Sequence, residues 1–112
     1  LLMDKFSSDE VDWSENDEEK AHYWQKQLHL FEVPFYYIEY GMAQLGAIAV
    51  WKNYKENPQK AIQQYMDALK LGYTKSIPEI YQTAGIAFDF SQDYIKELVT
   101  FVQNELQKIT EH

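Results

Sequence analysis

The chain has 112 residues, of which 46% are hydrophobic and 16% aromatic, and it carries a formal net charge of −8 with no cysteine and no arginine. Its length suits one domain that buries roughly two-thirds of the surface exposed by the unfolded chain. The negative charge argues against a nucleic acid or an anionic membrane as a partner, because both need a basic protein surface, and the lack of cysteine excludes disulfides and favours a cytoplasmic location.

The acidity is concentrated at the start of the chain. Residues 1–20 contain eight acids and two lysines, a net charge of −6, whereas residues 21–112 contain ten acids and eight lysines, a net charge of −2. Charged segments of this kind are typically solvated. We therefore predict an acidic, partly disordered leader over residues 1–13 and a helical segment over residues 14–112. Because the chain begins Leu1-Leu2-Met3, we interpret it as a piece of a longer protein.

The first helix is predicted over residues 15–32. This segment contains neither Gly nor Pro, and its apolar side chains recur on one face of a helix. Ser14 is a suitable N-cap, and acids follow in the first turn, where the helix dipole favours them. Pro34 should end the helix, because it lacks an N–H and disfavours a helical conformation in the residue before it.

Pro34 also suits the first turn of a second helix, which should run to about Tyr54. Residues 41–50 are apolar nearly all round, so we expect this helix to be buried inside something larger than a two-layer stack. Gly41 and Gly46 each cost about 1 kcal/mol relative to alanine within a helix, and we therefore expect close packing or backbone contact at both.

Three further helices are indicated by residues typical of helix ends. An Asn or Ser N-cap accepts a hydrogen bond from the first turn, Pro suits the first helical position, and Gly suits the residue after the last turn. Together with the two preceding helices they predict an all-α fold, with about five helices packed as a bundle. The end signals are Asn57-Pro58 and Gly72 for the third helix, a Ser76/Glu79 capping box and Gly85 for the fourth, and Ser91 for the fifth.

The histidines do not form the motif of a zinc peptidase. That motif is H-E-x-x-H on a helix, with two imidazoles as ligands and the glutamate as general base. The histidines here are His22, His29 and His112, and Tyr23 rather than a glutamate follows the first of them. We expect the chain alone to bind no metal, and His22 to be a partly exposed helix residue.

Residues 29–41, HLFEVPFYYIEYG, gather one imidazole and three phenols. Tyr37 and Tyr40 are three apart and Tyr36 and Tyr40 four apart, so either pair can share a helix face. His29 can fold back over the start of the second helix, where its N–H and the phenol O–H groups would converge and stabilise a developing oxyanion. The other interpretation is that these are core tyrosines whose hydroxyls bond to backbone carbonyls. The pattern leaves both open.

Residues 22–47, HYWQKQLHLFEVPFYYIEYGMAQLGA, resemble the C-terminal part of oligoendopeptidase F within the thimet-oligopeptidase family of zinc metallopeptidases. The stretches YMDALKLG (65–72) and AGIAFDFS (84–91) resemble the segments that follow there, so the resemblance covers about residues 20–110. It implies a mostly helical fold around a deep channel. It also implies that the zinc ligands and the general-base glutamate lie upstream, in the full-length enzyme.

The resemblance implies roles for four residues. His29, Tyr37 and Tyr40 are implied as catalytic residues that polarise the scissile carbonyl, and all three line the substrate channel. Tyr36 is implied as a further substrate-binding residue, because the spacing from the histidine differs by about one residue from the thimet branch. Tyr36 and Tyr37 therefore both stay candidates for the substrate-facing tyrosine.

The function implied is that of a C-terminal fragment of a zinc metalloendopeptidase that hydrolyses internal bonds of oligopeptides. Its partners would be the oligopeptide substrate and the missing N-terminal catalytic portion. The chain alone lacks H-E-x-x-H and is predicted to be inactive. An isolated fragment would expose the helix around residues 41–50, and we expect it to self-associate or to bind its missing half. The alternative is a stand-alone helical interaction module without catalytic activity.

Overall fold

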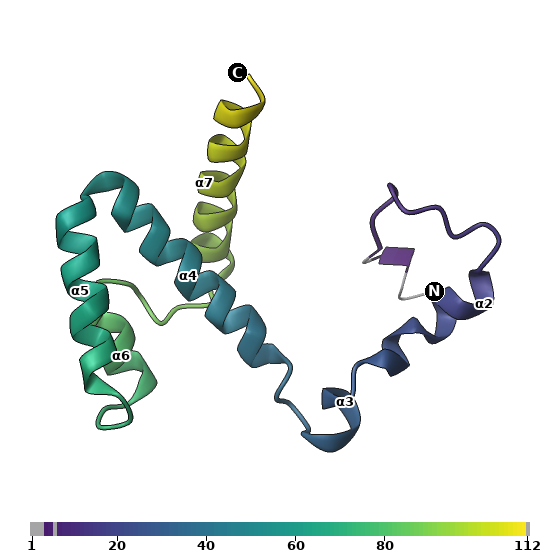
Figure 1. Cartoon of the computed structure of the whole chain (residues 1–112), viewed down its shortest axis with the longest axis horizontal. Helices are drawn as coiled ribbons and strands as arrows, with labels where there is room; N and C mark the ends of the chain where they lie inside the picture. The colour runs from purple at the N-terminus through teal and green to yellow at the C-terminus, as the bar shows by residue number, and fades with distance from the viewer. Residues whose placement is uncertain (1–3, 6, 112) are drawn as a thin grey trace. The chain divides into compact units, whose positions relative to one another are not determined.

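The computed structural model describes residues 4–5 and 7–111. All regular structure within these residues is helical, which confirms the predicted all-α fold. The chain divides into two compact units, Leu1–Ile38 and Glu39–His112. Figure 1 shows that the helices of the first unit are short and that the long helices belong to the second.

The predicted acidic leader lies partly outside the described residues, and its disorder stays a prediction. Residues 7–16 form bends and turns without a helix. The carboxylate of Asp4 forms an ion pair with the ammonium of Lys20 at 3.0 Å. This pair ties a described part of the leader to the helix that follows it.

Three short helical segments form the rest of the first unit. They are α2 (Asp17–His22), the 3₁₀ helix η1 (Tyr23–Lys26) and α3 (His29–Glu32). The prediction of one continuous helix over residues 15–32 is therefore wrong. None of the described residues before Glu39 is buried, so no core holds this segment in a single helix.

Local interactions explain the break and the later start. Gln27 leaves the helical region, with φ −86° and ψ 87°. The rings of Trp24 and Phe31 then stack with centroids 5.8 Å apart, whereas residues seven apart in a continuous helix are separated by about 10 Å along its axis. Ser14 is not the N-cap, because its N–H donates to the Asp12 carboxylate at 2.9 Å and α2 begins only after Asn16.

A turn at residues 34–37 precedes the longest apolar helix. Phe35 has φ 65°, in the left-handed region, where a right-handed helix cannot continue. The helix α4 (Ile38–Glu56) therefore begins four residues after Pro34, and the prediction that Pro34 opens it is wrong. Its observed end is close to the predicted Tyr54.

The second unit contains α4, α5 (Pro58–Leu71), α6 (Ile77–Thr83) and α7 (Gln92–Thr110). The predicted caps are confirmed. The Asn57 carboxamide oxygen accepts the N–H of Lys60 at 3.2 Å, and the Ser91 hydroxyl accepts the N–H of Tyr94 at 3.3 Å. Gly72 (φ 53°) follows α5 and Gly85 (φ 74°) follows α6, as expected for helix-ending glycines.

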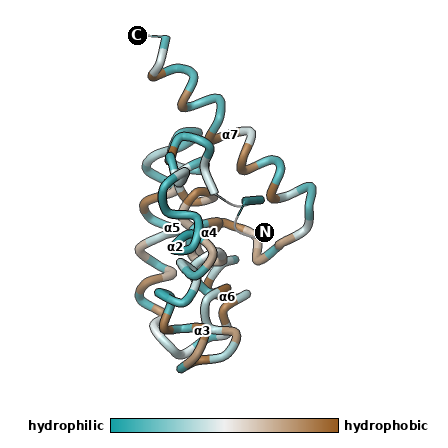
Figure 2. Tube along the Cα trace, turned by 90° about the vertical axis from the view of Figure 1, so that its right-hand side faces the viewer, coloured by the Kyte–Doolittle hydropathy of each residue, from teal (hydrophilic) through white to brown (hydrophobic). Residues whose placement is uncertain are grey.

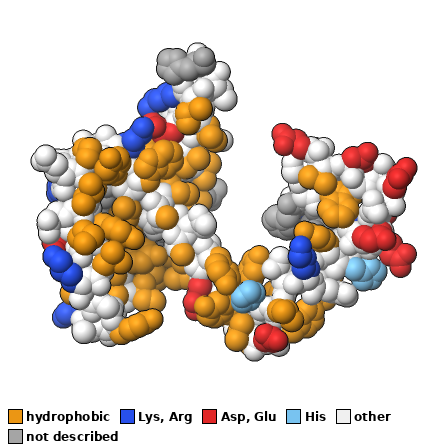
Figure 3. Space-filling model, in the orientation of Figure 1, with side chains coloured by type: hydrophobic (Ala, Val, Ile, Leu, Met, Phe, Trp, Pro, Cys, Tyr) orange, Lys and Arg blue, Asp and Glu red, His pale blue; other side chains and the backbone are white. Residues whose placement is uncertain are grey.

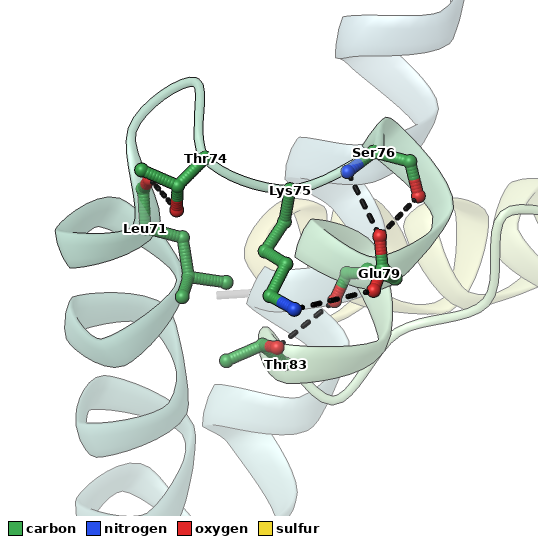
Figure 4. A network of polar contacts seen from close by, with 6 residues as sticks. All are labelled: Leu71, Thr74, Lys75, Ser76, Glu79 and Thr83. Carbon is green, nitrogen blue, oxygen red and sulfur yellow. Dashed lines mark hydrogen bonds and ion pairs between the residues drawn. The ribbon is translucent and has the colours of Figure 1, made fainter.

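The α5–α6 connection is held by a small polar network around Glu79 (Figure 4). Its carboxylate accepts the Ser76 N–H at 2.9 Å and pairs with the Lys75 ammonium at 3.7 Å, which confirms the predicted capping box. The hydroxyl of Thr74 donates to the Leu71 carbonyl at 2.6 Å and completes the end of α5. The Ser76 hydrogen bonds, and then Lys75, keep the pKa of Glu79 below its usual range.

Small side chains make up the core of the second unit. Among the described residues Leu98 is the one large side chain that is fully buried, at 1% exposure. Figure 2 shows apolar residues recurring along α7, and Figure 3 shows many hydrophobic side chains on the surface of this unit. On α4 only Gly46 and Ala49 are buried, so residues 41–50 are not enclosed by this chain alone. The other buried apolar residues are Ala61, Ala68 and Ala84.

Charged and aromatic contacts join α7 to α4. The Lys52 ammonium pairs with Glu97 at 3.0 Å, and the ring of Trp51 meets that of Phe101 edge-on with centroids 4.8 Å apart. The Lys55 ammonium lies 2.7 Å from the Glu105 carboxylate, which is 8% exposed. This buried carboxylate is thus paired with Lys55 of the neighbouring helix and with Lys108 of its own helix.

Candidate functional site

The first unit brings His29 next to two of the predicted tyrosines. The imidazole of His29 stacks on the Tyr36 ring, with centroids 5.8 Å apart and planes at 11°. It meets the Tyr37 ring edge-on at 5.9 Å and 63°. The predicted approach of the histidine to these phenols is therefore present, and we call these three residues the His–Tyr cluster.

The turn at residues 34–37 creates this cluster. The N–H of Val33 donates to the His29 carbonyl at 3.2 Å and ends α3, and the N–H of Tyr36 donates to the Val33 carbonyl at 3.1 Å. With Phe35 left-handed, the backbone reverses here and carries both tyrosines back to the first residue of α3. The sequence predicted that His29 folds back at Pro34 and lies over the start of a helix. The structure places a non-helical turn there instead.

The tyrosines of the cluster are accessible. Tyr36 is 42% exposed and Tyr37 45%, while His29 is half-buried beneath them. A tyrosine that serves the core of this chain would be enclosed by it, so the core interpretation is not supported here. An imidazole N–H and phenol O–H groups are uncharged donors, and such donors bind a carbonyl oxygen or a developing oxyanion.

Tyr40 lies in the first turn of α4 and belongs to the second unit, with its side chain 50% exposed. Tyr36 and Tyr37 are not helical, so the helical pairings predicted for Tyr37 with Tyr40 and for Tyr36 with Tyr40 are wrong. The catalytic and substrate-binding roles of His29, Tyr37, Tyr36 and Tyr40 stay predictions.

The described residues do not provide a metal site. They contain no group of three or more His, Cys, Asp or Glu side chains placed to hold an ion. The Nδ1 of His22 lies 2.8 Å from the Glu18 carbonyl within α2, which fits the expected helix-surface role. His112 lies outside the described residues. The donor set present here therefore does not fit a catalytic zinc.

Sequence reasoning did not locate an apolar cleft in the second unit. It has a volume of about 380 Å³ and lies between α4, α5 and α6. The glycine and alanines of α4 are the sequence feature that could have predicted this cleft, because small side chains leave space beside a helix. Residues from all three helices line it, including Ala43, Gly46, Val50, Leu69 and Tyr81.

Over the described part of the chain, each helix is too short or too polar to cross a lipid bilayer.

Comparison with known proteins shows a family to which the chain is similar. A family model described as peptidase family M3 matches residues 2–100, which include the His–Tyr cluster, Tyr40 and the apolar cleft. Searches of curated proteins and of solved structures found no match.

Proposed function

Because this chain belongs to peptidase family M3, a family of metallopeptidases, we propose that it is the C-terminal part of a zinc metalloendopeptidase similar to oligoendopeptidase F. The complete enzyme would hydrolyse internal bonds of oligopeptides. This part would supply residues that bind the peptide and stabilise the oxyanion. A cytoplasmic location belongs to the same proposal and rests on the lack of cysteine.

The observation that carries this proposal is the His–Tyr cluster. His29 lies within ring contact of Tyr36 and Tyr37, and both phenols are reachable from solvent. A peptide carbonyl gains negative charge as its carbon becomes tetrahedral. Uncharged donors held beside that oxygen bind the transition state more strongly than the ground state, which is the condition for raising the rate.

The zinc chemistry would belong to another part of the enzyme. The described residues contain no group of His, Cys, Asp or Glu placed to hold an ion, and in this proposal the ligands and the general base come from an N-terminal portion of the complete enzyme. A bound zinc ion supplies an activated water and polarises the carbonyl. The residues proposed here act on the peptide itself: His29, Tyr37 and Tyr40 as donors, with Tyr36 as a further contact.

The surface of the second unit supports contact with that missing portion. Large apolar side chains on α4, α5 and α7 are exposed, and exposed apolar patches mark interfaces. The same surface is also compatible with the second candidate function, a stand-alone helical interaction module without activity. The residues concerned include Trp51, Tyr65, Met66, Leu69 and Ile109.

The intact mass of the native protein distinguishes the enzyme from the module, since the enzyme should be several times heavier than this chain.

Activity of the complete protein tests the proposed roles. Tyr37→Phe and Tyr40→Phe each remove one hydroxyl, and each should lower kcat/KM for an oligopeptide by about 10²- to 10³-fold, because one oxyanion donor contributes about 3–4 kcal/mol. Tyr73→Phe is the matched control, since Tyr73 is fully exposed in the α5–α6 connection. Equal kcat/KM values for all three variants would show that the Tyr37 and Tyr40 hydroxyls do not stabilise the oxyanion.

A further inference from the structure

Tyr81 of α6 reaches the backbone of α4 near its start. Its hydroxyl donates to the Met42 carbonyl at 3.2 Å. The phenol lies directly against Gly46, where an added Cβ would stand 2.9 Å from the Tyr81 hydroxyl oxygen and 3.2 Å from Cζ. The glycine therefore allows the ring to lie on the helix backbone, and a side chain at position 46 would displace it.

Aromatic neighbours hold the Tyr81 ring in place. It meets Phe88 edge-on, with centroids 5.2 Å apart and planes at 89°, and Phe88 meets Phe90 in the same way at 4.9 Å. Burial raises the pKa of the Tyr81 hydroxyl, so it stays protonated as a donor at neutral and mildly alkaline pH. The hydroxyl is thus presented to α4 from a fixed position.

The first turns of α4 contain a glycine, Gly41, which weakens the helix there. Met42 lies two residues after Tyr40, and Gly41 stands between them. An added Cβ at Gly41 would meet no atom within 4 Å, so no neighbour packs against the helix at that residue. A glycine also weakens a helix by about 1 kcal/mol relative to alanine. The Tyr81 bond to the Met42 carbonyl ties the turn that directly follows Gly41 to α6.

We propose that Tyr81 is a positioning residue, which fixes the first turns of α4 and so sets the position of the Tyr40 hydroxyl. This inference rests on the proposed role of Tyr40 in the peptidase reaction. The Tyr81 hydroxyl contacts the backbone of α4. If Tyr81 acts by positioning Tyr40, the effect of removing its hydroxyl should depend on the Tyr40 hydroxyl being present.

A double-mutant cycle in the complete protein tests this. Tyr81→Phe keeps the ring and its contact with Phe88 and removes only the hydroxyl. We expect kcat to fall about three- to tenfold with little change in KM, the range that one neutral hydrogen bond spans. In a Tyr40→Phe background the same substitution should change kcat less than about twofold, because the group it positions has lost its donor.

Tyr94→Phe is the matched control. Tyr94, on α7, is a second partly buried tyrosine of this unit, and burial raises the pKa of its hydroxyl as it does for Tyr81. Thermal unfolding should show similar losses for Tyr81→Phe and Tyr94→Phe, whereas kcat should fall only for Tyr81→Phe. A parallel fall for Tyr94→Phe would show general destabilisation and overturn the inference.

Two other outcomes separate this inference from the proposed function. If Tyr40→Phe lowers kcat but Tyr81→Phe has no effect, or has the same effect in both backgrounds, positioning by Tyr81 is wrong and the role of Tyr40 stands. If Tyr40→Phe alone leaves kcat unchanged, the proposed role of Tyr40 is wrong, and the inference about Tyr81 is overturned with it.

Discussion

The two units differ in what determines their structure. In Glu39–His112, polar caps and glycines set the helix ends, and four helices close over a small core. In the described part of Leu1–Ile38 no residue is buried, and the helices are short and interrupted. Apolar periodicity therefore predicts a long helix correctly only where a core receives its apolar face. In the first unit, aromatic ring contacts lie across the points where the helix is interrupted.

Replacing a buried residue should give the largest effect on stability and test this contrast directly. Leu98→Ala should destabilise the chain by about 2–5 kcal/mol in urea unfolding, because it leaves a cavity in a core of otherwise small residues. Leu30→Ala, in the first unit, should change the free energy of unfolding by less than about 0.5 kcal/mol, since Leu30 is exposed. Equal losses would mean that the first unit has a core of its own.

The two tyrosines of the His–Tyr cluster can be ranked by activity. Tyr37→Phe should lower kcat/KM of the complete protein by about 10²- to 10³-fold, whereas Tyr36→Phe should act mainly on KM if Tyr36 only contacts the peptide. The measurement is steady-state kinetics on one oligopeptide. The reverse ranking would assign the donor role to Tyr36, whose ring is the one stacked on His29.

The glycines of α4 offer a matched pair within one helix. Gly46→Ala should destabilise the second unit by about 1–3 kcal/mol, because its Cβ collides with the Tyr81 phenol. Gly41→Ala should be neutral or stabilise by up to about 1 kcal/mol, since its Cβ meets open space. Thermal unfolding followed by circular dichroism measures both. A destabilising Gly41→Ala would reveal a contact that this chain does not provide.

The contact between α7 and α4 should show a small pH dependence. Hydrogen bonds from Lys108, and then from Lys55, hold the pKa of Glu105 below its usual 4.5. A carboxyl whose pKa is lowered by folding stabilises the folded state above its unfolded pKa, and this contribution is lost as the pH falls through the folded value. Urea midpoints should therefore fall less between pH 6 and about pH 3 for Glu105→Gln than for the parent chain. Identical pH profiles would contradict this role of Glu105.

The predictable parts of the fold are those with local causes. Asn57, Ser76 and Ser91 bond to backbone or side-chain groups three residues away, so their caps follow from the sequence. The break at Gln27 depends on the pairing of Trp24 with Phe31, and the late start of α4 depends on the conformation of Phe35. The spacing of apolar residues in the sequence predicts neither the break at Gln27 nor the late start of α4.

The candidate site shows the same division. The proximity of His29 to Tyr36 and Tyr37 was predictable, because Pro34 was expected to end the helix between them and to let His29 fold back. The helical pairing with Tyr40 was not, since it assumed a helix that begins too early. The close contact expected at the two glycines is present at Gly46 and absent at Gly41, because the partner that decides it, Tyr81, is 35 residues further along the chain.

The most direct test of the central claim is the effect of His29→Ala on kcat/KM of the complete protein with an oligopeptide substrate. His29 lies in ring contact with both tyrosines of the His–Tyr cluster, and its proposed role adds an N–H donor to theirs. We predict a fall of about 10²-fold or more, carried mainly by kcat. A kcat/KM value within twofold of the parent protein would contradict the claim that this part of the chain acts on the peptide carbonyl.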